Sequence, residues 1–214
     1  MTVLNFIGVI ILGYLIGSIP FGVIIGRLTR GIDVRDYGSG SMGMTNVIRT
    51  VGARAGVFVF LADVAKGAIA VALAWPIFGS LPDMFAWGQV AGGAAAVVGH
   101  SWPIYIGFRG GRGITTGFGA LLVMCWPVGL VSFTVFLLVV GLSRYVSLGS
   151  ILAALTMLVT MIPFVVLDVG PFGRFAYVVF GLIAVPIVIF RHRGNIQRLL
   201  SGTERKIGQK AEVS

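Results

Sequence analysis

The 214-residue chain contains few residues that ligate metals or form disulfides: one cysteine, two histidines and seven Asp and Glu residues in total. The lone Cys125 excludes an intrachain disulfide and a cysteine-based metal cluster. Neither an H-E-x-x-H motif nor a cluster of aspartates suited to Mg²⁺ is present. The sequence therefore predicts a protein that uses no metal ion and no other cofactor.

Charged residues are also scarce. They make up 11% of the chain, whereas soluble domains contain about 25%. Hydrophobic residues account for 57%, and the mean hydropathy is +1.00. Several apolar runs approach or exceed the roughly 18 to 20 residues that a helix needs to cross a bilayer. These features exclude an ordinary soluble domain and indicate an all-α, polytopic integral membrane protein.

Most of the charges that do occur are positive, and the net charge is +9. The Lys and Arg residues lie at the ends of apolar segments and form no basic face with interleaved aromatic residues. We interpret them as cytoplasmic anchors in the lipid bilayer together with an anion site, and we expect no nucleic-acid partner.

Six apolar segments are expected to be helical, at about residues 4–27, 56–79, 85–106, 114–143, 147–167 and 173–190. A single helix over 114–143 would be about 45 Å long, half as long again as the ~30 Å hydrocarbon core. A hairpin that turns near Trp126 and Pro127 removes the excess and makes seven helices, two of them short. The positive-inside rule then places the N-terminus outside and the C-terminus in the cytoplasm, with Arg174 as an exception.

These helices are expected to form one domain over residues 1–208, followed by a disordered tail over 209–214. In the first segment, Gly13 with Gly17 and Gly22 with Gly26 form two small-xxx-small faces for close helix packing. Pro20 is a site where this segment would kink.

Three polar islands interrupt the apolar chain, and the first covers residues 38–49. Its glycines formally match G-x-G-x-x-G, but no strand or βαβ unit surrounds them, and Met44 stands where a P-loop needs lysine. A helix that begins near Thr45 would direct backbone N–H groups at an anion. The alternative is a re-entrant turn whose glycines only permit tight packing. The candidate residues here are Ser39, Gly40, Thr45, Asn46 and Arg49.

The second island leads from residue 99 to residue 117 and has the composition of an anion-binding loop. Arg109 and Arg112 supply forked donors that match phosphate, and the neighbouring glycines let backbone N–H groups approach a ligand. Snorkelling of both arginines to the membrane interface is the alternative, although it needs no glycines. The glycines concerned are Gly110, Gly111 and Gly113.

The third island covers residues 191–206. A basic run beside a membrane helix is usually a lipid headgroup anchor. His192 and Asn195 are three residues apart, so they would share one face if the last helix continues through them. That pairing makes both of them candidates for the site.

Smaller polar features lie inside the apolar segments. Asp63 and Lys66 are predicted to form a structural ion pair beside the site, because an ionisable residue within a membrane is costly unless it is paired. Ser147 and Ser150 would either donate to a bound phosphate or cap a helix. His100 is more readily explained as a hydrogen-bonded packing residue than as a base.

The residues alone leave more than one function open. The acyltransferase pattern H-x4-D is absent, because Tyr105 follows His100 and Gln197 follows His192 at that spacing. A metal-free enzyme and a membrane transporter or binding protein for a phosphorylated metabolite both fit the arginines. A regulatory or structural membrane subunit is a third alternative.

Seven stretches in three ordered motifs are spread over nearly the whole chain: residues 17–22, 39–49, 63–67, 99–100, 108–113, 144–147 and 191–204. In these stretches the chain resembles the acyl-phosphate:glycerol-3-phosphate acyltransferases of bacterial membranes (PlsY type). The resemblance implies transfer of a fatty acyl group from acyl phosphate to the 1-hydroxyl of glycerol 3-phosphate. The products would be lysophosphatidic acid and phosphate, in the first step of phospholipid synthesis at the bacterial inner membrane. It also implies a reaction without metal or acyl-CoA.

The resemblance also assigns roles to residues. Ser39 and Arg49 would be active-site residues, and Arg112 and Arg109 stand where the family usually has phosphate-binding lysines. An arginine keeps the charge of lysine but not its geometry. His192, Asn195 and Ser147 would complete the substrate pocket, whereas Glu204 would be structural.

The expected mechanism follows from the substrate. Acyl phosphate has a good leaving group, so positioning and charge neutralisation can supply most of the catalysis. The proton of the attacking hydroxyl would go to the phosphate of glycerol 3-phosphate or to His192. We favour the phosphate because no Ser-His-Asp set is evident. Ser39 would orient a substrate. A soluble enzyme that supplies acyl phosphate is the expected protein partner.

Overall fold

The structure is a computed structural model that describes residues 1–209, and these residues form ten α-helices and no β-strand. The helices are α1 (Thr2–Gly17), α2 (Phe21–Arg30), α3 (Met44–Thr50), α4 (Ala53–Ala72), α5 (Ala74–Phe78), α6 (Pro82–Ser101), α7 (Ile114–Ser143), α8 (Val146–Val166), α9 (Phe175–Arg191) and α10 (Arg193–Leu200). Short 3-10 turns at Val34–Asp36, Ile104–Ile106 and Gly170–Phe172 lie in the connections. The all-α prediction is confirmed for the described residues.

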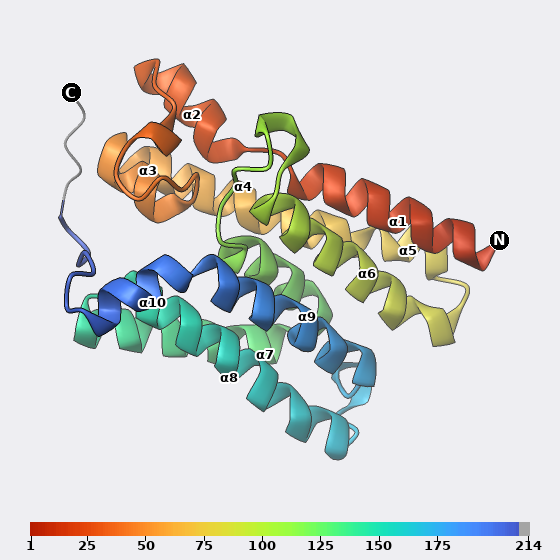
Figure 1. Ribbon diagram of the computed structural model, residues 1–214. Helices are drawn as coiled ribbons and strands as arrows, with labels where there is room; N and C mark the ends of the chain where they lie inside the picture. Colours follow the sequence, from red (N-terminus) through yellow and green to blue (C-terminus); the bar gives the residue numbers. More distant parts are fainter. Residues whose placement is uncertain (210–214) are drawn as a thin grey trace.

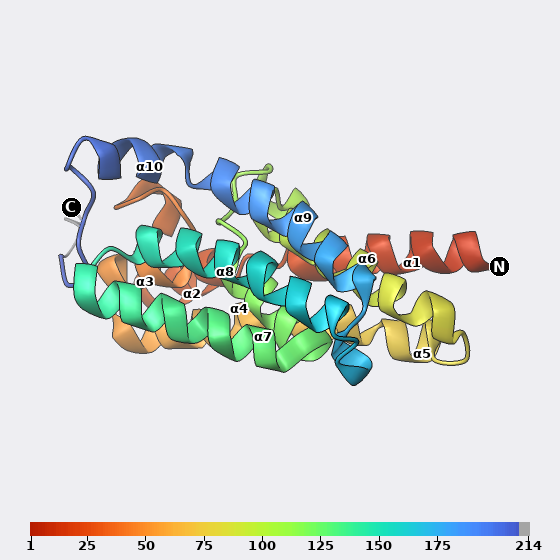
Figure 2. The same cartoon turned by 90° about the horizontal axis from the view of Figure 1, so that it is seen from below.

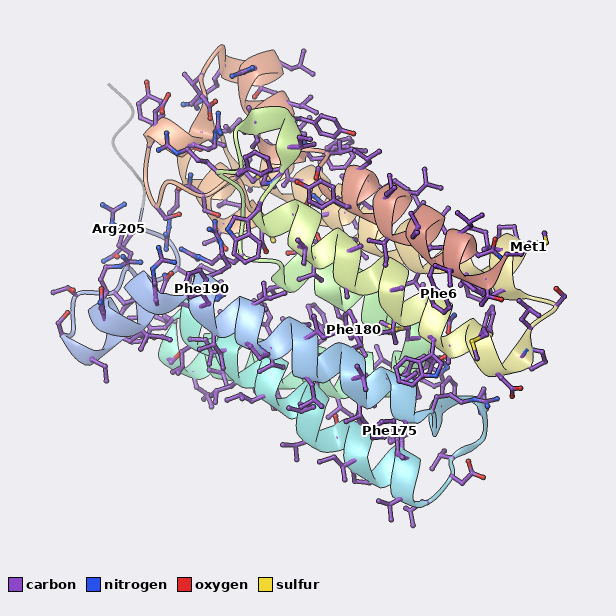
Figure 3. All side chains as sticks on the ribbon, turned by 45° about the vertical axis from the view of Figure 1, so that its right-hand side comes forward. Met1, Phe6, Phe175, Phe180, Phe190 and Arg205 are labelled. Atoms are coloured by element: carbon purple, nitrogen blue, oxygen red, sulfur yellow. The ribbon has the colours of Figure 1, made fainter. Side chains whose placement is uncertain are left out.

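Two groups of helices lie side by side (Figure 1). Helix α4 packs against α1, α6 and α7, while α7, α8 and α9 form the second group. Helix α6 joins the groups because it contacts both α1 and α9. Figures 1 and 2 show Met1 at one end of the bundle, with α3, α10 and the C-terminal segment at the other. The charged side chains gather at that second end, around Arg205 and Phe190 (Figure 3).

The helices have the length and surface of an integral membrane protein. Four helical stretches are long and apolar enough to cross a membrane: Thr2–Arg30, Ala53–Phe78, Ile114–Ser143 and Val146–Val166. A fifth is present if α9 and α10, which meet at 58°, form one broken span. Large apolar side chains such as Leu61, Leu138 and Phe175 are exposed on the outside of the bundle. An apolar exterior of this kind is stable in lipid rather than in water.

Helix α7 reverses direction near its middle. Cys125 has non-helical backbone angles (φ −153°, ψ 77°), two residues before Pro127. The rings of Phe118 and Phe133 stack with their centroids 5.0 Å apart, although fifteen residues of straight helix would separate them by about 22 Å. The predicted hairpin is therefore present, and it turns at the predicted place because proline cannot continue the helical hydrogen bonds.

The first predicted segment breaks at Pro20, as predicted, and consists of α1 and α2, which together form one apolar stretch over Thr2–Arg30. The chain leaves the helical conformation between Gly17 and Phe21, where Pro20 (φ −92°, ψ 68°) precedes α2. The two predicted glycine faces then differ in their partners. A methyl group on Gly13 or Gly17 would meet the backbone of α6, whereas one on Gly22 or Gly26 would meet the loop over residues 32–42.

Two other predicted helices also differ in their limits. The segment predicted at 85–106 ends at Ser101, because Trp102 is extended (φ −134°, ψ 70°) as expected for a residue before proline. The segment predicted at 56–79 begins at Ala53 and divides into α4 and α5 after Ala72. Of the predicted tail over 209–214, Gln209 accepts a hydrogen bond from Lys206 N (2.9 Å), and residues 210–214 lie outside the described residues.

The contact between α1 and α6 can be tested with glycines of one helix. Gly17 faces the backbone of Ala96, whereas Gly8 has nothing within 4 Å of the position of a Cβ atom. Gly17→Leu is expected to lower the unfolding temperature in detergent by about 5 °C or more, because overpacking costs about 1–3 kcal/mol. Gly8→Leu should leave that temperature within about 2 °C of the unmodified protein. Equal shifts in the two variants would contradict the described contact.

Candidate functional site

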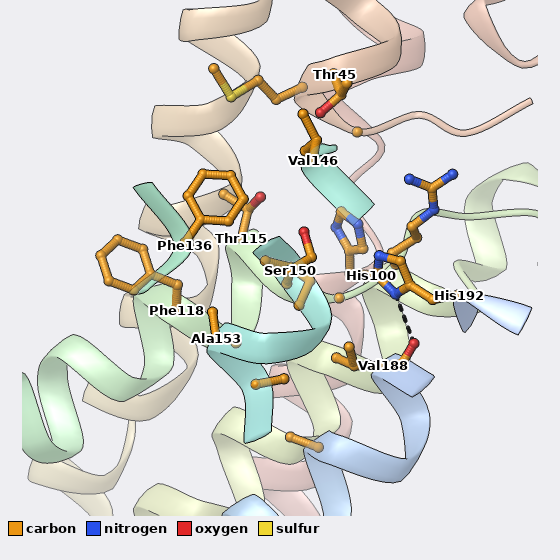
Figure 4. A pocket seen from close by; sticks show the side chains of 18 of the residues that line it. Thr45, His100, Thr115, Phe118, Phe136, Val146, Ser150, Ala153, Val188 and His192 are labelled. Atoms are coloured by element: carbon orange, nitrogen blue, oxygen red, sulfur yellow. Dashed lines mark hydrogen bonds between the residues drawn. The ribbon is translucent and has the colours of Figure 1, made fainter. Parts of the chain in front are cut away.

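A cavity at the polar end of the bundle has a charged and hydroxylated mouth and an apolar interior. Its polar lining comes from all three islands, and its apolar lining comes from both halves of α7 and from α8 and α9 (Figure 4). The polar residues include Ser39, Ser41, Thr45, Asn46, His100, Arg112 and His192; the apolar ones include Phe118, Leu121, Phe133, Phe136, Met157 and Phe180. Such a cavity can take a ligand that has an anionic head and a long apolar tail.

Asn46 holds the first island in shape. This residue is buried near the start of α3, and its Nδ2 donates to Val34 O (2.7 Å), Ser41 O (2.8 Å) and Tyr37 O (3.2 Å). Its Oδ1 accepts from Ser39 N (2.9 Å). Asn46 was predicted to bind substrate, but these bonds occupy its amide. Its local effect is to fix the loop that presents Ser39 to the cavity.

The other residues of the first island divide between the cavity and the C-terminal segment. The helix predicted to begin near Thr45 begins at Met44, and Thr45 lines the cavity. Arg49, at the far end of this seven-residue helix, does not line it. Its Nη2 lies 3.4 Å from Arg205 O and 3.5 Å from Lys206 O. Gly40 (φ +67°) serves the turn between Ser39 and Ser41 and does not line the cavity.

The two arginines of the second island have different environments. Arg112 lines the cavity and is half-buried, and none of the ion pairs among the described residues includes it. Burial lowers the pKa of Arg112 to about 10, so its guanidinium is cationic at neutral pH. Arg109 is exposed and lies outside the cavity. The structure therefore places one arginine, Arg112, where it can meet an anion.

Two of the glycines beside Arg112, which were predicted to bind substrate, pack against His100. Gly111 N donates to His100 O (3.0 Å), so this N–H is not available to an anion. A methyl group on Gly110 or Gly111 would overlap His100. Arg191 donates to Gly111 O (2.9 Å) and to Gly110 O (2.8 Å). Only Gly113, in the left-handed conformation (φ +80°), lines the cavity.

His192 lies at the cavity wall, at the bend between α9 and α10. The shared face of His192 and Asn195 required the last helix to continue through them, but the chain bends at His192 and the condition is not met. The ring of His192 is buried, and its Nδ1 lies 2.8 Å from Val188 O (Figure 4). A carbonyl oxygen can only accept, so Nδ1 carries the hydrogen and Nε2 is the acceptor of the neutral ring. His192 thus offers the cavity a hydrogen-bond acceptor.

Asn195 and Ser147 were predicted to line the substrate pocket, but both are hydrogen-bonded to Glu204. Its Oε1 accepts from Asn195 Nδ2 (2.6 Å) and from Ser147 Oγ (2.7 Å), and its Oε2 pairs with Arg198 Nε (2.8 Å). Neither Asn195 nor Ser147 lines the cavity. These bonds fasten the segment after α10 to the start of α8, as the structural role predicted for Glu204 requires.

The ion pair predicted between Asp63 and Lys66 is confirmed. Lys66 Nζ lies 2.7 Å from Asp63 Oδ1, and both side chains are almost completely buried. Lys66 Nζ also donates to Ile19 O (3.0 Å), at the break between α1 and α2, and the same oxygen accepts from Phe21 N (3.2 Å). His100 Nδ1 lies 3.6 Å from Asp63 Oδ1. The pair thus supports a wall of the cavity.

Sequence reasoning missed two kinds of residue at this site. Arg191 was interpreted as a headgroup anchor, but it clamps the two carbonyls next to Arg112. Ser132 lies in an apolar run and carries no motif, yet it lines the cavity with a buried hydroxyl that has no partner among the described residues. The signal for Arg191 was its position beside His192; for Ser132 the sequence offered none.

The Glu204 cluster generates a pH prediction. Burial alone would raise the pKa of Glu204, but the hydrogen bonds from Asn195, Ser147 and Arg198 lower it overall, below the ordinary value of 4.5. A lowered pKa in the folded state contributes stability that is complete above about pH 4.5 and is lost as the pH falls through the folded value.

The unfolding temperature of Glu204→Gln, compared with that of the unmodified protein, measures this contribution. The difference between the two should be largest near pH 7 and should shrink as the pH falls below 4.5. Asp36→Asn is the matched control, because Asp36 is exposed and takes part in no ion pair among the described residues. A difference for Glu204→Gln that stays constant with pH would show that its carboxylate charge is not what fastens the segment.

Comparison with known sequences identifies one family. The model of the glycerol-3-phosphate acyltransferase family matches residues 7–202. A protein of that name from Parasynechococcus marenigrum (strain WH8102) is 50% identical over 200 residues, which are 94% of this chain and 89% of the relative. Another, from Thermoanaerobacter sp. (strain X514), is 42% identical over 203 residues, which are 95% and 96% of the two chains.

Two solved structures have the same fold. Both are crystal structures of PlsY (YgiH), an integral membrane glycerol 3-phosphate acyltransferase, at 35% sequence identity. The glycerol 3-phosphate form superposes with a TM-score of 0.84 and covers 95% of this chain and 96% of that chain. The lysophosphatidic acid form gives a TM-score of 0.81 with 95% of each chain covered.

Proposed function

The chain belongs to the glycerol-3-phosphate acyltransferase family, and from this premise we propose that it takes its acyl group from acyl phosphate. It is an acyltransferase of phospholipid synthesis that acylates glycerol 3-phosphate and forms lysophosphatidic acid. The donor supplies a phosphate leaving group, so the protein need not supply a strong acid.

One observation carries the proposal. The cationic Arg112 has no carboxylate partner within residues 1–209 and stands at the polar mouth of a cavity whose interior is apolar. An unpaired charge in such surroundings is costly, and an anionic ligand removes that cost. Acyl phosphate and lysophosphatidic acid both combine a phosphate with a long apolar chain. The stacked rings of Phe118, Phe133 and Phe136 would then lie along that chain.

In the proposed reaction, the 1-hydroxyl oxygen of glycerol 3-phosphate attacks the carbonyl carbon of acyl phosphate. A carbon–oxygen ester bond forms, the bond from that carbon to the phosphate oxygen breaks, and inorganic phosphate leaves. Arg112 would hold a phosphate group, and Ser39 with Thr45 would orient a substrate by hydrogen bonds. Asn46, Arg49, Asn195 and Ser147 would act by fixing the loop and the C-terminal segment around these groups.

We propose that the phosphate of glycerol 3-phosphate, rather than His192, accepts the proton of the attacking hydroxyl. The Nδ1 of His192 bonds to a neutral carbonyl, and no carboxylate of the described residues bonds to the ring to stabilise an imidazolium. Arg112 and Arg191, which lie near His192, also disfavour a positive ring. Nε2 of His192 would accept a hydrogen bond from the other hydroxyl of glycerol 3-phosphate and so orient the substrate.

The finer topology is part of the same proposal. Seven helices, with α7 contributing two, would place the N-terminus outside and the C-terminus in the cytoplasm of a bacterial inner membrane. The cavity mouth at Arg112, whose pKa Arg198, Arg49 and Arg191 lower electrostatically, would then face the cytoplasm. Residues 1–208 would form one domain. A soluble enzyme that produces acyl phosphate would deliver the donor on that side.

The two arginines of the second island provide a matched test of function. Purified protein with a chelator present is expected to form lysophosphatidic acid from glycerol 3-phosphate and palmitoyl phosphate, and none from palmitoyl-CoA. Arg112→Ala should lower kcat/KM about a hundredfold, because a charge-assisted contact to phosphate is lost. Arg109→Ala should stay within about threefold, since Arg109 is exposed and lies outside the cavity.

Three outcomes would contradict parts of the proposal. Product from palmitoyl-CoA alone would assign a different donor. Activity that the chelator abolishes would show a metal requirement. Equal losses in Arg109→Ala and Arg112→Ala would show that the cavity at Arg112 is not the phosphate site.

Two substitutions of His192 test the proton acceptor. Glutamine keeps an acceptor in the side chain but cannot take the proton, so His192→Gln should lower kcat by less than about tenfold. Loss of a general base costs about 10² to 10⁴. His192→Phe keeps a ring and removes the acceptor, so it should lower kcat further. No detectable activity in a folded His192→Gln that still binds glycerol 3-phosphate would make His192 the base.

A further inference from the structure

We propose that His100 is a positioning residue for Arg112: its carbonyl and ring seat the Gly110–Gly111 backbone that carries the Arg112 guanidinium to the cavity. The inference deepens the proposed function, because it rests on Arg112 as the phosphate ligand. It assigns a purpose to the buried group of Asp63, Lys66 and His100, which the reaction itself does not use.

The backbone before Arg112 sits directly on the end of α6. Gly111 N donates to His100 O (3.0 Å), and the atom nearest to a Cβ at Gly111 would be His100 Nε2. A Cβ atom on Gly110 would overlap His100 O and would also come close to Ser101 O. The contact leaves no space for a side chain at either position, so a change in the His100 ring alters the surface on which this backbone rests.

The opposite side of the same backbone is held by α9. Arg191 donates from Nε and Nη2 to the carbonyls of Gly111 and Gly110, and its guanidinium lies 5.6 Å from the centre of the Trp102 ring. Tyr14 Oη fixes Trp102 by donating to its carbonyl (2.9 Å). Residues 110 and 111 are thus clamped between α6 and α9, and the next residue is Arg112.

His100 is in turn held from behind. Its Nδ1 faces Asp63 Oδ1 at 3.6 Å, and Asp63 pairs with Lys66 at 2.7 Å. Lys66 donates to Ile19 O at the break between α1 and α2. A Cβ atom on Gly99, the residue before His100, would overlap Tyr14 O, so α1 supports this end of α6 directly. With Nδ1 toward Asp63 and Nε2 toward Gly111, the ring is aimed at protein groups.

This arrangement explains why a buried ion pair stands beside the site. The pair itself contributes little net stability, because desolvation offsets attraction. It does hold the Asp63 carboxylate 3.6 Å from Nδ1 of His100, which favours one orientation of the ring. Packed supports of this kind hold a substrate-binding group to within about 0.5 Å. Arg112 then needs no internal partner of its own, and its guanidinium is left for the phosphate.

The test is a double-mutant cycle on glycerol 3-phosphate turnover with the full-length enzyme. Arg112→Ala, His100→Ala and the double variant are compared with the unmodified protein for kcat and for KM. KM is measured for both glycerol 3-phosphate and palmitoyl phosphate. His100→Ala alone should raise it roughly tenfold for the substrate whose phosphate Arg112 binds, with little change in kcat. In the Arg112→Ala background it should change KM by less than about twofold, because the group through which it acts is gone.

Two further variants keep the cycle decisive. His100→Asn retains a polar group toward Asp63 but removes the ring beneath Gly111, and it replaces His100→Ala in the cycle if that variant does not fold. Tyr177→Phe, which removes a buried hydrogen bond to Gln89 of the same α6 (2.6 Å), should leave KM unchanged in both backgrounds and controls for general loosening of the helix.

The possible outcomes distinguish a failure of the role proposed for His100 from a failure of the phosphate role proposed for Arg112. Equal effects of the His100 variant in both backgrounds would show that it does not act through Arg112, and would overturn the inference alone. A folded His100 variant with unchanged KM would do the same. An Arg112→Ala enzyme with unchanged KM and kcat would remove the phosphate role of Arg112 and, with it, the inference.

Discussion

The site depends on holding irregular backbone at the end of an apolar bundle. In such surroundings each unpaired N–H or C=O group costs free energy, so non-helical chain persists only where protein groups satisfy it. Each of the three polar islands is held by a buried or half-buried side chain. Asn46 satisfies the first loop, Arg191 satisfies the carbonyls of the second, and Glu204 fastens the third.

The residues that hold the loops in place are therefore different from the residues that line the cavity. Ser39, Thr45, Arg112 and His192 line the cavity, while the side chains that hold them are engaged with backbone or with one another. A guanidinium held in place before the ligand arrives costs no reorganisation during the reaction, which is how a fixed charge contributes most to catalysis.

Close contacts between helix backbones also help to position the site, in the apolar part of the bundle. Gly13 and Gly17 of α1 meet the backbone of α6, and Gly67 and Gly119 bring α4 against the first half of α7. Helices gain little from burying apolar surface in lipid, so they associate through small residues that allow close packing. This packing fixes the end of α6, from which the loop that carries Arg112 departs.

Much of this molecule was predictable from the sequence, because hydropathy and helix length are local properties. The apolar runs gave the helices, the excess length of residues 114–143 with Pro127 gave the hairpin, and the i,i+3 spacing gave the pair of Asp63 and Lys66. The three motifs indicated the family. None of these inferences required knowledge of which segments meet.

The tertiary structure decided which members of each motif face the cavity. Arg109 and Arg112 are equivalent in composition, yet only Arg112 is directed into the cavity, because His100 and Arg191 clamp the two residues before it. The sequence likewise could not show that Asn195 and Ser147 meet Glu204, since the helix bends at His192 and brings together residues 57 positions apart. Contacts between distant segments depend on the packing of whole helices, and no local pattern encodes them.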